Sequence, residues 1–450
     1  MRRIVLTIMA LWLSFGVAVH AQTHVQEFRL DASNNSIVRS IGDDQSLMLV
    51  EDSSGVNYFV LHEDNHPSAL AFAMPSGIKV HDVRVWKDQT AYFCGTDTAS
   101  NDAVAGFFDI ASAFAGTGLV NYCGLSSYSS IRLTKATDAK RLDLYNIGST
   151  VFMAMVGDAL FDSVMQQPTT TVSVASYYGG NWHPWVYQRK PHNVQFTDIV
   201  CLDNTVVAVA KDTNSRFTYV KTFFRTYDFP RQPCMNGDFM VIDYGYYTYG
   251  DVFVTKMVDD TVAIASIDKK EGGSVVVHKV PIDNVTGMPV YPIETWKAPL
   301  CMPPSSSSGV LEMSAVGNRV WALVDAPLIP SPATDNWLMD VTLNSPAATA
   351  VMTAYNQSLG SAQCFDLSTV SHNPRLTCND SRLLLYTPGW NASTGSCYIS
   401  DTSSLSIDDA AMRLYQASEN AAQVTPIPSW HTPVIEIIPS IIRCTPFIDK

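Results

Sequence analysis

The sequence predicts an all-β fold, and within that class a β-propeller of seven four-stranded blades. Three observations lead to this prediction: a hairpin pattern that recurs seven times, further apolar runs after most hairpins, and a low share of charged residues. The 450 residues are 46% hydrophobic but only 16% charged. Such a charged share lies below the usual quarter, which disfavours disorder and long solvated helices as the main content.

Each hairpin combines an alternating apolar run, a short polar turn and a second run rich in Val, Ala and aromatic residues. Alternation with a period of two residues is typical of β-strands. Asp, Asn and Gly at the turns tolerate the left-handed backbone that tight hairpins need. The turns fall at Asp44, Asp88, Gly148, Asn204, Asp260, Asn318 and Asp380. These positions define a repeat of roughly 56 residues.

A third apolar run follows most hairpins, and a fourth, more irregular run with aromatic residues and Pro comes after it. The third runs include 56–61, 103–110, 217–224, 274–280 and 337–343. The fourth runs include 69–74, 183–191 and 293–300. Stacked four-stranded blades bury both faces of each sheet, which accounts for the scarcity of charge. A six- or eight-bladed ring and two stacked β-sandwiches are the alternative architectures.

Three segments fall outside the repeat. Residues 24–31 precede the first hairpin and are one candidate for an outer strand that closes the ring on the last blade. Residues 432–444 are the competing candidate. Residues 406–421 begin with a Ser N-cap, continue with acidic residues, and space apolar residues at helical intervals. We therefore expect one short helix near the C-terminus.

The N-terminus carries the pattern of a secretory signal peptide. Arg2 and Arg3 form a positive region, and an apolar stretch and small residues around Ala21 follow. We expect residues 1–21 to be removed and residues 22–450 to form a single β-propeller domain. The protein would then be exported, to the periplasm, the cell surface or the medium, with no membrane insertion after cleavage.

Charge and cysteine content restrict the classes of partner. The formal net charge is -13, and it becomes -15 once Arg2 and Arg3 are lost. Nucleic-acid binding needs clustered Lys and Arg, so we predict no nucleic-acid partner. Nine cysteines are spread over the mature chain without a CxxC motif. Cys94 and Cys201 lie inside apolar strand-like runs, where we expect buried, inert thiols.

Two stretches carry a family resemblance. The run HDVRVWKDQTAYFCG with the following AVAGFFDI, and the run WHPWVYQRKPHNVQFTDIVCLDNTVVAVA, resemble uncharacterised exported β-propeller proteins of Gram-negative bacteria. The resemblance covers most of the mature chain at the level of the blade pattern. It implies a propeller fold and export, and it carries no catalytic residues over to this chain.

Two aromatic clusters are the candidate ligand-binding sites. The first contains Tyr178, Trp182 and Trp185, and the second contains Tyr244, Tyr246 and Tyr247. Exposed Trp and Tyr side chains offer flat faces to the apolar side of sugars, or contact area to a protein partner. Packing of outer-strand aromatic residues on the neighbouring blade is the alternative interpretation.

His62 to His66 formally match the H-E-x-x-H zinc motif, but that chemistry needs both imidazoles on one helix face. The motif follows a strand-like run and leads into Pro67, so we predict a polar turn and no metal site. No cofactor is predicted. If the protein is a glycoside hydrolase, its paired carboxylates are drawn from the loops between second and third strands, at Asp97, Asp102, Asp212, Asp268, Glu271 and Asp325. A solvated or turn-capping role is the alternative interpretation for each of them.

The sequence thus favours an exported binding module that presents aromatic loops to a glycan or a protein partner. A structural subunit of a surface assembly is one alternative. A glycoside hydrolase or lyase with carboxylates at the mouth of the channel is the other, and it depends on analogy between folds. Whether the protein is an enzyme stays open at this point.

Overall fold

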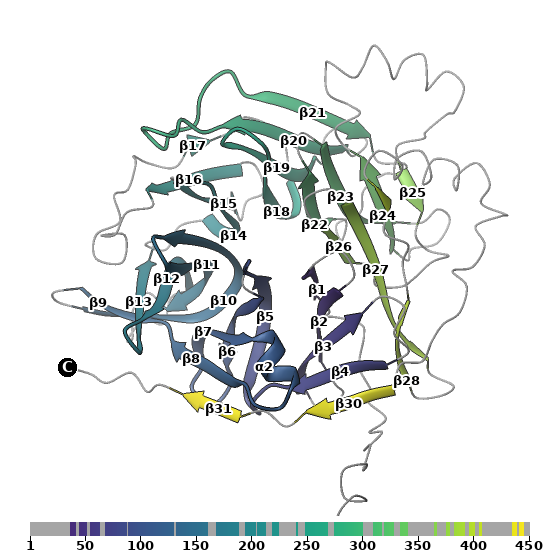
Figure 1. The fold of residues 1–450 in the computed structure, drawn as a ribbon. Helices are drawn as coiled ribbons and strands as arrows, with labels where there is room; N and C mark the ends of the chain where they lie inside the picture. Colours follow the sequence, from purple (N-terminus) through teal and green to yellow (C-terminus); the bar gives the residue numbers. More distant parts are fainter. Residues whose placement is uncertain are drawn as a thin grey trace, which may run out of the picture.

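The computed structural model forms a ring of seven β-sheets around a central axis (Figure 1). It describes residues 37–41, 45–51, 55–63, 68–87, 89–129, 132–160, 168–188, 194–203, 205–212, 218–224, 240–241, 248–268, 274–299, 309–316, 319–327, 334–340, 364–366, 375–378, 382–391, 396–400, 405–406, 434–438 and 441–444. The predicted all-β propeller with seven blades is confirmed.

Blades are numbered in chain order, and the first strand of each lies nearest the axis (Figure 1). Blade 1 contains β1 (Ile37–Ser40), β2 (Gln45–Glu51), β3 (Asn57–Glu63) and β4 (Ser68–Ala73). Blade 2 contains β5 (Ile78–Val85), β6 (Thr90–Asp97), β7 (Asp102–Asp109) and β8 (Leu119–Gly124). Blade 3 contains β10 (Arg132–Ile147), β11 (Thr150–Leu160), β12 (Pro168–Tyr178) and β13 (Asn181–Gln188), with β9 (Ser126–Ser129) beside β10.

The remaining four blades follow the same antiparallel order. Blade 4 contains β14 (Val194–Cys201), β15 (Thr205–Asp212), β16 (Thr218–Phe224) and β17 (Met240–Val241). Blade 5 contains β18 (Thr248–Lys256), β19 (Thr261–Asp268), β20 (Ser274–Pro281) and β21 (Glu294–Pro299). Blade 6 contains β22 (Gly309–Val316), β23 (Arg319–Pro327), β24 (Thr334–Asp340) and β25 (Cys364–Asp366). Blade 7 contains β26 (Arg375–Cys378), β27 (Arg382–Asn391), β28 (Ser396–Ser400) and β29 (Leu405–Ser406), which pairs with β27.

The predicted third and fourth runs coincide with outer strands. For example, the run at 274–280 is β20, and the run at 69–74 is β4 with one neighbouring residue. Two of the predicted turns also have the expected backbone, since Gly148 has a φ of 60° and Asp260 a φ of 50°. Hydrophobic period and turn chemistry therefore located the hairpins correctly.

A β-bulge interrupts the first hairpin in five blades, which the sequence did not reveal. Each bulge shifts the register of the inner strand and re-aims the residue that follows it. The residues immediately after the shifts are Asp82, Arg141, Asp198, Phe253 and Glu312. The bulges thus place one side chain per blade at equivalent positions on the inner strands.

Glycine permits the tight backbone contact at two of these bulges. Gly95 pairs with Val80 in blade 2, and Gly157 pairs with Ala139 in blade 3. A Cβ on Gly95 would lie 1.9 Å from the carbonyl oxygen of Lys79, and a Cβ on Gly157 would lie 2.0 Å from that of Asp138. No other residue type fits at either position without a backbone shift.

The hydrophobic core lies between blades and is divided into separate clusters. One cluster joins blades 1 and 2 through residues such as Phe59, Phe72, Phe93 and Phe108, whose rings pack at centroid distances of 4.9 to 6.4 Å. Further clusters join blades 2 and 3, 3 and 4, 4 and 5, and 5 and 6. Because both faces of these blades are buried, few positions remain for charge, as the composition indicated.

The described helix is α2 (Ile110–Phe114), which follows β7 at the outside of blade 2. Asp109 caps it, accepting a hydrogen bond of 2.7 Å from the backbone N–H of Ser112. The sequence did not predict this helix. Of the predicted helix at 406–421, Ser406 ends β29, and the rest lies outside the described residues.

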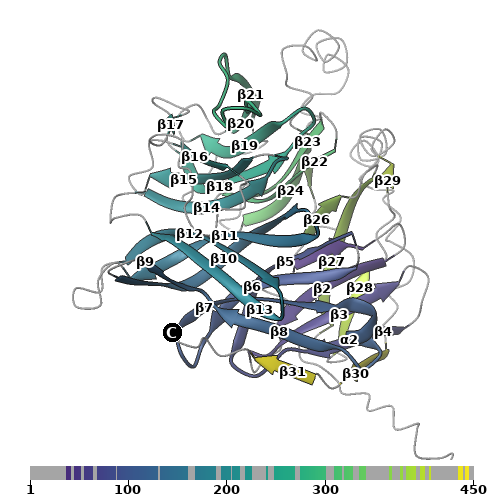
Figure 2. The same cartoon turned by 60° about the vertical axis from the view of Figure 1, so that its left-hand side comes forward.

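The C-terminal run forms two strands that pair with the outer edges of the first two blades. β30 (Val434–Ile438) runs parallel to β4, and β31 (Ile441–Cys444) runs parallel to β8 (Figures 1 and 2). The run had been a candidate for closing the ring on the last blade, so this placement corrects that expectation. The physical benefit is that two exposed sheet edges are covered. The competing candidate at 24–31 lies outside the described residues.

Candidate functional site

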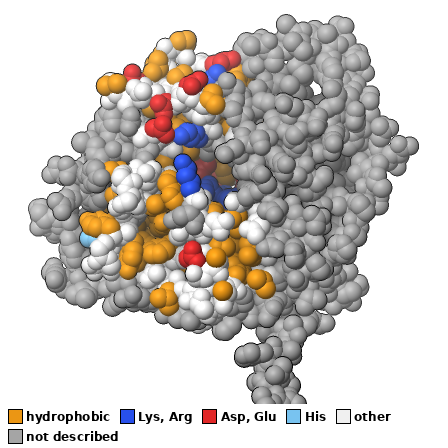
Figure 3. Space-filling model, in the orientation of Figure 1, with side chains coloured by type: hydrophobic (Ala, Val, Ile, Leu, Met, Phe, Trp, Pro, Cys, Tyr) orange, Lys and Arg blue, Asp and Glu red, His pale blue; other side chains and the backbone are white. Residues whose placement is uncertain are grey.

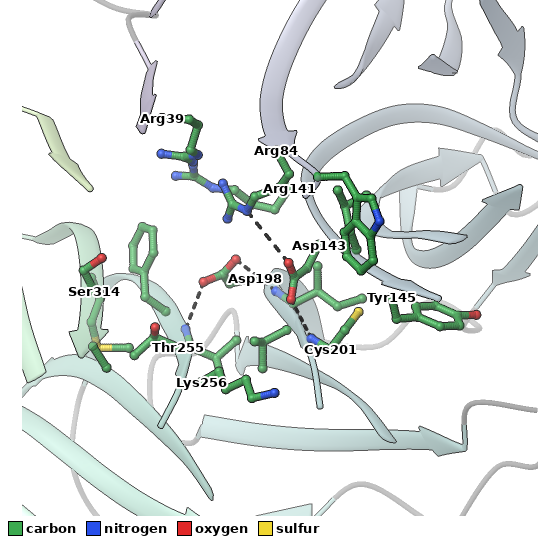
Figure 4. A pocket seen from close by; sticks show the side chains of 18 of the residues that line it. Arg39, Arg84, Arg141, Asp143, Tyr145, Asp198, Cys201, Thr255, Lys256 and Ser314 are labelled. Carbon is green, nitrogen blue, oxygen red and sulfur yellow. Dashed lines mark hydrogen bonds and ion pairs between the residues drawn. The ribbon is translucent and has the colours of Figure 1, made fainter. Parts of the chain in front are cut away.

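A cavity of about 530 Å³ lies on the propeller axis, lined by the inner strands of blades 1 to 6 (Figure 4). Its cationic side chains are Arg39, Arg84, Lys87, Arg141 and Lys256. Its acidic side chains are Asp143, Asp198, Asp203 and Glu312. Figure 3 shows basic side chains gathered in the middle of this face of the molecule, with acidic ones beside them. The volume is that of a pocket for a small molecule.

Asp82 joins blade 2 to blade 3 beside this cavity. The side chain is fully buried, and Oδ1 accepts hydrogen bonds from the backbone N–H of Val83 at 2.8 Å and from Arg39 Nη2 at 2.9 Å. Oδ2 accepts the backbone N–H of Leu142, on the inner strand of the next blade, at 3.1 Å. Burial opposes ionisation of Asp82, but Arg84, Arg39 and Arg141 together hold its pKa below the ordinary value.

Asp198 makes the same connection from blade 4 to blade 5. Its Oδ1 accepts the backbone N–H of Ile199 at 2.9 Å, and its Oδ2 accepts that of Val254 at 2.9 Å. Burial raises the pKa of Asp198 to about 6, although Arg141 and these two N–H groups act in the opposite direction. Both carboxylate oxygens are therefore engaged by the protein backbone.

Arg39 spans the axis between blades that are not neighbours in the ring. Its Nη1 contacts Glu312 of blade 6 at 2.9 Å, its Nη2 contacts Asp82 of blade 2 at 2.9 Å, and its Nε donates to the carbonyl of Val83 at 3.0 Å. The side chain is only 11% exposed. Its donors are thus used within the protein, and Arg39 serves to hold blades 1, 2 and 6 together.

Arg84 and Asp143 lie side by side in the lining of the cavity. Arg84 Nη1 lies 3.1 Å from Asp82 Oδ1, and its Nε lies 4.0 Å from Asp143 Oδ1. Asp143 Oδ2 accepts the backbone N–H of Cys201 in blade 4 at 2.7 Å. Burial raises the pKa of Asp143, while Arg84 partly opposes that shift.

Arg141 differs from the other two arginines of the cavity. Its guanidinium carbon lies 5.3 Å from the centroid of the Phe253 ring, across the inner strand of blade 4. Among the described residues, no hydrogen bond or ion pair uses its N–H groups, although its charge acts on Asp82 and Asp198 from a distance. Figure 4 shows it beside Arg84, with Asp143 and Asp198 on the facing side.

The first predicted aromatic cluster lies on the outer strands of blade 3, away from the axis. The hairpin at Gly179 and Gly180 leaves blade 3 at the same sheet end as the turn at Gly148, close to the Asn146 that lines the cavity. Tyr178 is 47% exposed and stacks on His183 with ring centroids 3.8 Å apart. Of this cluster, Tyr178 presents the most open face to solvent.

Trp182 and Trp185 are half-buried and contribute to packing between blades. The Trp182 ring lies 5.6 Å from Phe107 of blade 2 and 5.4 Å from Tyr177, so it fills the contact between blades 2 and 3. Trp185 packs against the core between blades 3 and 4 and stacks near Tyr187. Their role in ligand binding stays a prediction. The second cluster, Tyr244, Tyr246 and Tyr247, lies outside the described residues.

The remaining sequence candidates lie elsewhere. Asp97 and Asp102 do flank the loop between the second and third strands of blade 2, at the sheet end opposite Trp86 and the cavity. Of the H-E-x-x-H match, His62 and Glu63 end β3, and 64–67 lie in the connection to β4, outside the described residues. Cys94 and Cys201 are buried, as predicted, and burial raises the pKa of the Cys94 thiol.

In the part of the chain that the structure describes, no His, Cys, Asp and Glu side chains group as a metal site would require. The same part contains no helix with the length and apolar character needed to cross a bilayer. Three of the four acidic residues that line the cavity, Asp143, Asp198 and Glu312, lie on inner strands. The acidic residues that the sequence nominated lie at other positions, in predicted loops. The sequence signal for these three is a charged residue inside the first apolar run of a hairpin.

Comparison with known proteins finds similar folds among solved structures and no similar sequences. Neither protein-family models nor curated proteins match the chain. A candidate 6-phosphogluconolactonase from Bacteroides fragilis is 12% identical with a TM-score of 0.45, over 82% of this chain and 96% of that one. Prolyl oligopeptidase B from Galerina marginata is 8% identical with a TM-score of 0.44, over 83% of this chain and 50% of that one. A protein of unknown function from Dyadobacter fermentans is 8% identical with a TM-score of 0.38, over 69% of this chain and 93% of that one.

Proposed function

We propose that this β-propeller is an exported binding module that takes a small polar ligand, the end of a glycan chain, into its axial cavity. The single observation that carries the proposal is the convergence of charged and aromatic side chains from six blades on one cavity of about 530 Å³. Pockets of this size, with a few well-placed polar groups, are the usual sites for small ligands.

The lining suits a carbohydrate because it combines two kinds of surface. Trp86 supplies an aromatic ring for the apolar face of a sugar, while Arg141 and Lys87 supply hydrogen-bond donors for its oxygens. The exposed Tyr178 lies at the same sheet end as the turn beside Asn146, so a longer glycan or a protein partner has a second contact there. The signal-peptide pattern at 1–21 and the resemblance to exported Gram-negative propellers support a location outside the cytoplasm.

A glycan array probed with the mature protein, residues 22–450, tests the proposal. We expect binding to a defined group of saccharides, and loss of that binding in Trp86→Ala. This variant should stay folded at the assay temperature with a lowered melting temperature, because Trp86 also packs against the core between blades 2 and 3. Lys135→Gln is the matched control, because Lys135 pairs with Asp102 at a distance from the cavity. An array without signal, or binding that survives Trp86→Ala and is lost in Tyr178→Ala, would refute the cavity as the site.

A glycoside hydrolase is the second candidate, favoured by the raised pKa of Asp198 in a cavity that also holds Asp143. Against it stands the hydrogen bonding of Asp198, since both of its oxygens accept backbone N–H groups. Incubation of the mature protein with each bound saccharide, followed by an assay for new reducing ends, separates the two candidates. New reducing ends that disappear in Asp198→Asn would establish the hydrolase.

A further inference from the structure

The hydrogen-bonding capacity of the cavity is unevenly distributed among its charged groups. Asp198 accepts two backbone N–H groups, and Asp143 accepts the N–H of Cys201. Arg39 and Arg84 donate to Asp82, and both also donate to the carbonyl of Val83. These groups are already committed to holding the blades together.

Arg141 is the exception, since no hydrogen bond among the described residues uses its guanidinium. The contact with Phe253 at 5.3 Å fixes the plane of the group without consuming any N–H donor. Five donors in a planar fork are therefore available to a ligand that enters the cavity. A carboxylate matches the geometry of this fork with two parallel hydrogen bonds.

The balance of charge around the cavity limits the negative charge that a bound group can carry. Five cationic and four acidic side chains line the cavity, and the buried Asp82 behind Arg39 and Arg84 brings the total to balance. A group with one negative charge therefore adds little repulsion, while a doubly charged phosphate meets Asp143, Asp198 and Glu312 at greater cost. The exposed Lys87 at the edge of the cavity adds a further donor.

From these observations we infer that the cavity selects acidic saccharides, and that Arg141 holds the carboxylate of a uronic acid residue. This inference rests on the proposed function and narrows it to one class of ligand. The aromatic ring of Phe253 keeps the guanidinium oriented, and Lys87 contributes a second positive charge near the entrance.

Titration calorimetry with three probes tests the inference: galacturonate, galactose and galactose 1-phosphate. We expect galacturonate to bind at least tenfold more tightly than either of the other two. Arg141→Gln should weaken galacturonate binding about tenfold to hundredfold while galactose binding stays the same, since a bidentate charge-assisted contact is lost. Arg141→Lys should restore part of the loss, because it keeps the charge but not the fork.

Lys135→Gln is the control for removal of a cation outside the cavity, and a thermal melt of each variant verifies folding. Equal affinity for galacturonate and galactose, with both lost in Trp86→Ala, would overturn the acid selectivity and leave the proposed function intact. Preference for galactose 1-phosphate would overturn the carboxylate assignment. Absence of binding by all three probes and by every saccharide on the array would refute the proposed function itself.

Discussion

Asp82 and Asp198 occupy the same position in blades 2 and 4, and each joins its blade to the next by the same hydrogen bonds. Both follow a β-bulge, both accept the N–H of the residue after them, and both accept an N–H from the next inner strand. Their surroundings differ, because Asp82 contacts two arginines directly and Asp198 contacts none. The pKa of Asp82 is therefore lowered, and that of Asp198 is raised.

Asp82→Asn should be severely destabilising. The substitution leaves Arg39 and Arg84 without their shared anion, and breaking a buried pair on one side typically costs about 3–5 kcal/mol. The free energy of unfolding in urea measures the effect. Asp102→Asn removes a partly exposed pair with Lys135 and should cost less than about 1 kcal/mol. Comparable losses in the two variants would contradict the structural role of Asp82.

Asp198 makes the stability depend on pH in the opposite sense to an ordinary salt-bridged carboxyl. Its pKa is about 6 in the folded protein, against 3.8 as the ordinary value, so the folded state retains the proton over that interval. Stability from this group is present below pH 4 and is lost as the pH rises through about 6, by about 3 kcal/mol in total.

Unfolding experiments on the wild type and on Asp198→Asn, at pH values from 4 to 7.5, isolate this contribution. As the pH rises, the wild type should lose stability relative to Asp198→Asn, because only the wild type titrates at this position. A difference that is constant across the range would show that Asp198 is ionised throughout, with an ordinary pKa.

Ligand binding should follow the same titration. When Asp198 becomes neutral, Asp143 and Glu312 remain opposite Arg39, Arg84, Arg141 and Lys256, and the cavity carries one more positive charge. Galacturonate should then bind roughly threefold to tenfold more tightly at pH 5.5 than at pH 7.5. Calorimetry at the two pH values measures the ratio, and galactose is the neutral control. Equal galacturonate affinities at the two pH values would show that the charge of Asp198 does not affect ligand binding.

Gly95→Ala and Gly157→Ala should each destabilise the fold by at least about 2 kcal/mol. The new Cβ would lie within 2.0 Å of a carbonyl oxygen in the paired inner strand, so the bulge must rearrange. Gly124→Ala is the matched control, because a Cβ there meets no atom within 4 Å. Thermal melts of the three variants should separate the first two from the third, and three equal melting temperatures would contradict the described bulges.

Removal of the C-terminal strands should expose sheet edges. A chain that ends at residue 431 lacks β30 and β31, and β4 and β8 then have unpaired outer edges. We expect a lower melting temperature and concentration-dependent association, measured by calorimetry and light scattering. A truncated protein that stays monomeric and equally stable would show that the two strands are dispensable.

The sequence was sufficient to predict the blades and insufficient to predict the cavity. Period-two alternation and the turns at Gly148 and Asp260 reflect local backbone preferences, which one sequence records directly. The cavity depends instead on contacts such as that between Arg39 and Glu312, which lie 273 residues apart. Such contacts form only when the ring closes, and local sequence patterns do not predict which residues then meet.

The bulges and the C-terminal strands were missed for related reasons. A bulge such as that before Asp198 adds one residue to an otherwise regular run, and the hydrophobic period tolerates this without a visible break. β30 has the apolar composition of any strand, so its sequence does not say which partner it pairs with. It pairs in parallel with the outer edge of β4, which no other described strand covers. The aromatic residues of blade 3 were conspicuous in sequence, yet Trp182 largely fills the space beside Phe107.

The most direct test of the central claim is a crystal structure of the mature protein with the saccharide that binds best on the array. We expect electron density for the saccharide in the axial cavity, with both carboxylate oxygens of the saccharide within hydrogen-bond distance of Arg141. Density at Tyr178 or on another surface, with the cavity occupied by water, would contradict this claim.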